Sequence, residues 1–120
     1  MNCTILCVSG GRDFDDYELL KLKLDDYKKK YKDLIIITGG ARGADELAVK
    51  YAKNNHLKFV IFKSDWGKYP KNAGFINNQK LYNQSQMIIC FWDEKSSGTK
   101  NMIKLCKQGK KPFEIVIYKK

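Results

Sequence analysis

Short apolar runs alternate with segments of helical periodicity along this 120-residue chain. The five runs, rich in Ile, Val, Leu and Phe, cover residues 4–8, 34–38, 58–62, 87–92 and 114–118. Between them, helices are expected from an Asp15 cap to about residue 31, and over residues 44–54, 73–84 and 98–107. Buried strands separated by helices are typical of a parallel sheet that is covered on both faces. The sequence therefore predicts a single α/β domain over residues 1–120, with a Rossmann-like parallel five-stranded sheet and helices on both faces.

The apolar runs are too short for a membrane protein. Uninterrupted apolar runs such as residues 34–37 are far below the roughly 18 residues that a membrane span needs. Residues 1–8 are apolar but have no basic leader and run directly into a glycine turn, so a secretory signal is not indicated. The sequence predicts a cytoplasmic protein that does not bind a membrane.

The cysteines and the histidine do not have the spacing of a metal site. Cys3, Cys7, Cys90 and Cys106 form no Cys-x-x-Cys pair, and His56 is the only histidine. We expect all four cysteines to be reduced and structural, with no metal and no cofactor.

The positive charge is unevenly distributed. Residues 1–49 carry a net charge of −1 and residues 50–120 carry +11, giving +10 in total. A basic half favours a polyanionic partner, although lysines on solvent-facing helices also keep a protein soluble. Of the 23 basic residues only Arg12 and Arg42 are arginines, and both lie in glycine-rich loops. Their planar, forked donors suit a phosphate or a carboxylate.

Glycine-rich segments follow three of the predicted strands, at the edge where Rossmann-like sheets bind ligands. In the first, Gly10 and Gly11 permit a sharp turn and a close approach of the backbone to a ligand, while Arg12 could hold a phosphate. The alternative is an ordinary turn in which Arg12 pairs with Asp13 or Asp16.

The second and third segments each lead directly into a predicted helix. Residues 38–45 place a glycine-rich turn before a helix, which is the arrangement that binds phosphate, although Asp45 could equally be a first-turn acid that accepts backbone N–H groups. Residues 93–99 offer hydroxyl and amide donors for a second phosphate, and Ser96 or Ser97 could also cap the helix. Between these segments, Trp66 could stack on a base or cover the core. The amides of Asn77 and Asn78 could bind a ribose or a base edge, or could equally lie on the surface.

Taken in order, residues 8–14, 39–45, 65–66, 73–78 and 96–99 resemble the YspA/cpYpsA-related branch of the SLOG superfamily, which also includes the LOG hydrolases and DprA. The resemblance implies binding of a nucleotide-derived phosphorylated small molecule, such as an NAD- or ADP-ribose-related signal in bacterial and phage conflict. The ligand-binding residues that it implies are Gly10, Gly11, Arg12, Gly39, Gly40, Arg42, Gly43, Asp45, Trp66, Asn78, Ser97, Gly98 and Thr99.

The chain departs from those relatives at two positions. Asn77 stands where many relatives carry an arginine, unless Lys71 or Lys80 substitutes for it. The LOG hydrolases carry a catalytic glutamate soon after the residue that matches Thr99, whereas this chain continues Lys-Asn-Met. Hydrolysis of an N-glycosidic bond needs a positioned carboxylate, so the sequence favours a protein without catalytic residues.

Three functions are therefore compared. The preferred one is a non-enzymatic sensor or sequestering sponge for the ligand. The second is a LOG-like nucleotide-processing enzyme that uses Asp13, Asp45 or Asp93, and the third and least favoured is single-stranded nucleic acid binding, as in DprA. The resemblance also implies a homo-oligomer, because domains of this group commonly pair through helices, with Phe75, Tyr82 and Met102 as either contact or core residues.

Overall fold

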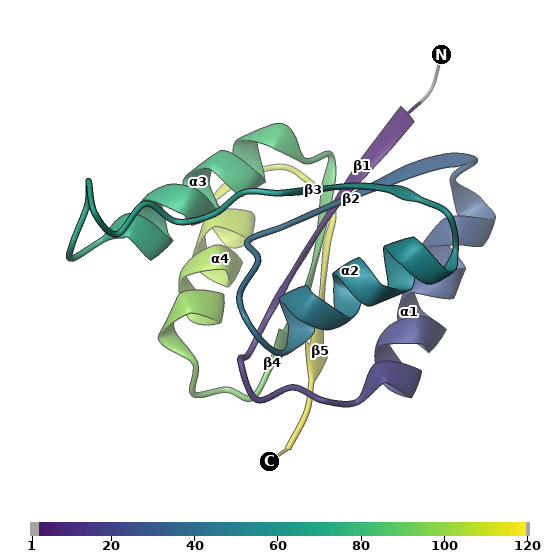
Figure 1. Cartoon of the computed structure of the whole chain (residues 1–120), viewed down its shortest axis with the longest axis horizontal. Helices are drawn as coiled ribbons and strands as arrows, with labels where there is room; N and C mark the ends of the chain where they lie inside the picture. Colours follow the sequence, from purple (N-terminus) through teal and green to yellow (C-terminus); the bar gives the residue numbers. More distant parts are fainter. Residues whose placement is uncertain (1–2, 120) are drawn as a thin grey trace.

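The computed structural model describes residues 3–119 and contains the expected strands and helices in the expected order (Figure 1). The strands are β1 (Cys3–Gly10), β2 (Asp33–Thr38), β3 (Lys58–Ile61), β4 (Met87–Trp92) and β5 (Phe113–Ile117). The helices are α1 (Tyr17–Lys30), α2 (Ala44–Asn54), α3 (Ala73–Gln84) and α4 (Ser97–Gln108). All neighbouring strands pair in parallel, in the order β3-β2-β1-β4-β5. The predicted Rossmann-like sheet is confirmed.

The strand order reverses at β1. The chain first adds β2 and β3 on one side of β1, and then places β4 and β5 on the other side. Helices α1 and α2 cover one face of the sheet, and α3 and α4 cover the other (Figure 1). A reversal of this kind leaves a crevice outside the carboxyl ends of the central strands, which is where such sheets bind ligands.

The central strand is buried on both faces because its apolar residues point alternately to each side. Leu6 and Val8 pack in a cluster with Tyr51 of α2, whereas Cys7 packs in a second cluster with Met102 of α4. A fully buried leucine or methionine side chain contributes about 1.5–3 kcal/mol of transfer free energy. The sheet is therefore stabilised by two apolar layers, and its carboxyl edge is held rigidly between them.

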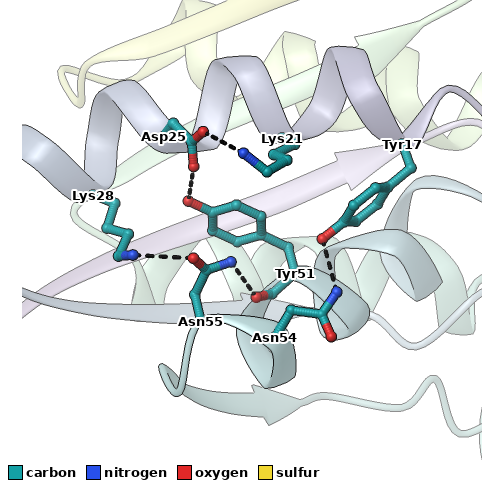
Figure 2. Close-up of polar contacts among 7 residues, drawn as sticks. All are labelled: Tyr17, Lys21, Asp25, Lys28, Tyr51, Asn54 and Asn55. Carbon is teal, nitrogen blue, oxygen red and sulfur yellow. Dashed lines mark hydrogen bonds and ion pairs between the residues drawn. The ribbon is translucent and has the colours of Figure 1, made fainter.

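A polar network joins α1 to α2 on the first face (Figure 2). Tyr51 is fully buried, and its hydroxyl donates to the Asp25 carboxylate at 2.6 Å, which also accepts from Lys21 at 3.0 Å. These bonds lower the pKa of Asp25, with the Tyr51 hydroxyl as the larger cause. Asn54 of α2 donates to the hydroxyl of Tyr17 at 3.1 Å. The network satisfies the polar end of an otherwise buried ring.

The predicted cap of the first helix was wrong by one residue. Asp16, not Asp15, is the N-cap, and its carboxylate accepts the N–H of Leu19 at 3.1 Å. The reason is tertiary, because Phe14 is buried against Phe91 with ring centroids 4.8 Å apart. This anchor keeps the preceding turn outside the helix.

Helix α4 also differs from the prediction, because it begins one residue earlier, at Ser97.

The cysteines are free thiols with two different environments. Cys7, Cys90 and Cys106 are buried in the core, as small apolar side chains usually are, whereas Cys3 is exposed at the start of β1. Within residues 3–119, no group of histidine, cysteine or acidic side chains has the arrangement of a metal site. Over the same residues, no helix is both long enough and apolar enough to cross a membrane.

Candidate functional site

A cavity of about 820 Å³ lies at the carboxyl edge of the sheet, at the strand reversal. This volume is in the range of small-molecule sites, about 300–1,000 Å³. Most of the residues that the sequence singled out line it: Gly10, Gly11, Arg12, Gly39, Gly40, Asp45, Trp66, Asn78, Ser97, Gly98 and Thr99. The fold therefore brings together segments that are far apart in the sequence.

Arg42 and Gly43 do not line this cavity. Arg42 borders a separate hollow of about 450 Å³ beside α2, together with Lys50 and Lys53. Gly43 has φ of +79°, and a Cβ there would collide with the carbonyl oxygen of Gly11, so Gly43 permits the close contact of two loops. The two arginines therefore border different hollows, Arg12 the main cavity and Arg42 the hollow beside α2.

Donors of the β2–α2 loop are bound by the chain itself. Asp45 is only 7% exposed, and its carboxylate accepts the N–H of Ala41 at 3.1 Å and that of Gly39. The N–H of Ala44, the first residue of α2, donates to the carbonyl oxygen of Gly11 at 3.2 Å. Burial raises the pKa of Asp45 from 3.8 to about 6, although the backbone donors and the charge of Arg12 act in the opposite direction. A carboxylate therefore already occupies this part of the loop.

The start of α4 is different, because its donors are not used. Ser96 is the N-cap but makes no capping bond, and its hydroxyl lies 3.4 Å from that of Thr99. In the described part of the chain, the N–H groups of Ser97, Gly98 and Thr99 have no acceptor. Free N–H groups at a helix start carry a partial positive charge and bind anions. This end of the cavity is the one that can hold a phosphate through the backbone.

The three carboxylates that line the cavity all have donors from the chain. Asp13 accepts the hydroxyl of Tyr118 at 2.6 Å, and Asp45 holds the loop described above. Asp93 accepts the N–H groups of Lys95 and Ser96 at 2.9 and 2.8 Å, which lower its pKa. None of these carboxylates forms an ion pair with a cation within residues 3–119, although the charge of Arg12 acts on Asp45.

The cations of the cavity, in contrast, are unpaired. Arg12, Lys63 and Lys71 line it, and none of them forms an ion pair with another residue of the described chain. The alternative in which Arg12 pairs with Asp13 or Asp16 is not observed, because those carboxylates bind other groups. The cations of the cavity therefore keep their donors available, while its carboxylates are held in place by hydrogen bonds from the chain.

Aromatic side chains border the cavity on the side of α3. Trp66 is 51% exposed and Phe75 is 50% exposed, so Trp66 does not cover the core. The indole lies about 3.7 Å from the position that a Cβ on Gly74 would take. An exposed indole at a cavity rim can stack on a flat ring.

Of the three residues considered for self-association, Phe75 is the most exposed, since Tyr82 is half-buried and Met102 is buried.

Two neighbouring asparagines of α3 have structural partners. Asn78 donates to the carbonyl oxygen of Gly98 at 3.0 Å and to Asn101 at 2.9 Å, which ties α3 to the start of α4. Asn77 is buried rather than on the surface and donates to the carbonyl oxygen of Phe62. Of the lysines that could replace the missing arginine, Lys71 lines the cavity and Lys80 does not.

The sequence did not indicate Lys63 or Phe75 as cavity residues. One signal could have found them, because the polar stretch after β3 starts at the same carboxyl edge as the glycine-rich loops.

A comparison with known protein families identifies one match. The sequence model of the YspA, cpYpsA-related SLOG family matches residues 4–69, more than half of the chain and the part that holds the first two glycine-rich loops. No curated protein and no solved structure matches the chain. The chain therefore belongs to the YspA, cpYpsA-related SLOG family, a membership that suggests a nucleotide-related role in binding or processing.

Proposed function

We propose that the protein binds a nucleotide-derived, phosphorylated small molecule in the 820 Å³ cavity, without converting it, as a sensor or a sequestering protein. The observation that carries this proposal is the contrast between the acids and the bases of the cavity. Its carboxylates are bound by donors of the chain, whereas Arg12, Lys63 and Lys71 form no ion pair within residues 3–119. Cations that form no ion pair can turn their donors toward an anion in the cavity.

The arrangement of the lining supports a nucleotide rather than a simple anion. A phosphate is expected at the free N–H groups of Ser97, Gly98 and Thr99, with Arg12 as its side-chain partner. The exposed indole of Trp66 offers a flat surface for a base or another ring.

Binding without conversion is supported by the carboxylates. Hydrolysis of an N-glycosidic bond requires a carboxylate that can act as acid, base or stabiliser of the oxocarbenium ion. Asp13 and Asp93 accept hydrogen bonds within the chain, and the residues that follow Thr99 include no acid near the start of α4.

Asp45 supports a second candidate function, a nucleotide-processing enzyme. It lines the cavity, and its pKa of about 6 is in the range of a general acid or base at neutral pH. In this alternative, Asp45 would exchange a proton with the ligand while the backbone N–H groups of the loop hold the Asp45 carboxylate in place.

Calorimetry and product analysis separate the two functions. Purified protein is titrated with ADP-ribose, NAD and AMP, and the same mixtures are then analysed by chromatography for hydrolysis products. We expect saturable 1:1 binding of at least one of these compounds and no product. Product formation that is lost in Asp45→Asn would favour the enzyme, and absence of binding by all three compounds would contradict the proposal. Native mass spectrometry of gently purified protein extends the test to a ligand that co-purifies.

A further inference from the structure

Tyr118, which follows the last strand, lies against the first glycine-rich loop. Its backbone N–H donates to the carbonyl oxygen of Trp92 at 3.0 Å, which continues the pairing of β5 with β4. Its ring packs edge-on against Phe14, with centroids 4.8 Å apart, and its hydroxyl donates to the Asp13 carboxylate at 2.6 Å. The end of the chain is thus bound to a loop that lies more than a hundred residues earlier.

The loop is built to accept this contact. A Cβ on Gly11 would collide with the hydroxyl of Tyr118, so any other residue there would displace this hydroxyl. The carbonyl oxygen of Gly11 accepts the N–H groups of Phe14 and Ala44 at 3.3 and 3.2 Å. The backbone on both sides of Arg12 is therefore fixed, and the freedom that remains is in the side chains.

Arg12 and Asp13 are adjacent, and both line the cavity. A free carboxylate beside a free guanidinium would normally pair with it, which would use the donors that a ligand needs. Here the Asp13 carboxylate accepts from Tyr118 instead, and Arg12 forms no ion pair with any of the residues that the structure describes. Burial, the hydrogen bond and the charge of Asp13 raise the pKa of Tyr118, so its hydroxyl remains a donor at neutral pH.

We propose that Tyr118 is a positioning residue that binds the Asp13 carboxylate, prevents it from pairing with Arg12 and so keeps the Arg12 guanidinium free for a ligand phosphate. The part that concerns the ligand rests on the proposed function. The part that concerns Arg12 does not, and it can be tested without any ligand.

The first test observes Arg12 directly by NMR of the arginine Nε–H groups. The chain has only two arginines, so two signals are expected, and Arg42→Ala assigns them. In Tyr118→Phe, which keeps the ring, we expect the Arg12 Nε–H signal to shift and to exchange more slowly with water as the pair with Asp13 forms. Adding Asp13→Asn should restore the original signal. An Arg12 signal that does not change in Tyr118→Phe would overturn the inference.

The second test measures affinity for inorganic pyrophosphate by calorimetry. We expect Tyr118→Phe to weaken binding about tenfold in the parent chain but less than about twofold when Asp13→Asn is already present. Tyr51→Phe is the matched control, because it removes a hydroxyl that also donates to an aspartate at 2.6 Å but lies between α1 and α2 (Figure 2).

The results distinguish this inference from the proposed function. An equal loss of pyrophosphate affinity in both backgrounds would show that Tyr118 is merely structural and would overturn the inference, while the proposed function would stand. If Arg12 responds in the NMR spectra but no variant binds pyrophosphate or a nucleotide, the role of Tyr118 stands and the proposed function fails.

Discussion

Two helix starts border the cavity, and they use their backbone donors in opposite ways. At the start of α2, N–H groups of the preceding loop donate to the Asp45 carboxylate, and the first helical N–H donates to the carbonyl oxygen of Gly11. At the start of α4, the first three N–H groups have no acceptor within residues 3–119. One glycine-rich segment already holds an internal anion, and the other is free to receive one from a ligand.

The difference shows that a glycine-rich loop before a helix is not sufficient evidence for a phosphate site. The loop of α2 matches the expected pattern more closely in sequence, yet Asp45 uses its donors. Helix α4 has a shorter pattern, but Gly98 has open space around it. Whether a helix start can bind a phosphate depends on whether an acid of the chain already accepts its backbone N–H groups.

The largest expected effect concerns the internal anion at α2. The pKa of Asp45 is raised from 3.8 to about 6, so the folded protein binds the proton more tightly than the unfolded chain does. The contribution of Asp45 to the free energy of unfolding is therefore largest below pH 3.8. It falls by about 3 kcal/mol as the pH rises from 3.8 through about 6. Asp45→Asn should remove this decline, as measured by urea unfolding between pH 4 and about 7.

Asp93→Asn serves as the control for this prediction. The pKa of Asp93 is lowered, so its stabilising contribution is lost as the pH falls, which is the opposite direction. The assignment to Asp45 would fail if Asp45→Asn kept the same decline in stability as the parent protein.

A second prediction concerns a variant in which a new carboxylate accepts the free N–H groups at the start of α4. Gly98→Asp places a carboxylate at the helix start, where a Cβ meets nothing within 4 Å. The new acid should stabilise the helix by about 0.5 kcal/mol but weaken nucleotide binding about 100-fold, because it occupies the N–H groups and repels phosphate. Gly98→Asn, which has the same shape without the charge, should weaken binding much less. Equal affinity of Gly98→Asp and the parent for ADP-ribose in calorimetry would place the phosphate elsewhere.

The third prediction separates the two arginines. Arg12→Ala should weaken binding of ADP-ribose about tenfold, because Arg12 lines the main cavity, whereas Arg42→Ala should change it less than about twofold. Calorimetry at fixed salt concentration measures both variants. The reverse order of effects would mean that the ligand binds in the hollow beside α2.

The smallest effect is expected for a residue outside both loops. Tyr51→Phe removes the bond to Asp25, so the free energy of unfolding should fall by about 1 kcal/mol in urea titrations. Binding should not change, since this network lies between α1 and α2 (Figure 2). A loss of affinity without a loss of stability would show that the sheet transmits changes from this face to the cavity.

The sequence predicted the sheet and the helices well because both depend on local periodicity and apolar content. Most of the predicted site residues line the cavity, since the strand ends of a parallel sheet meet at one edge. The position of Arg42 could not be predicted, because the direction of the turn depends on positive φ angles at Gly40 and Gly43. The contact between Tyr118 and Asp13 joins opposite ends of the chain, and no local pattern indicates it.

The most direct test of the central claim is amide NMR of the protein during titration with ADP-ribose. We predict that the N–H signals of Ser97, Gly98 and Thr99 shift strongly downfield as a phosphate accepts them, while that of Ala41, already bound to Asp45, moves little. Saturable binding that shifts Ala41 and leaves the start of α4 unchanged would contradict the account.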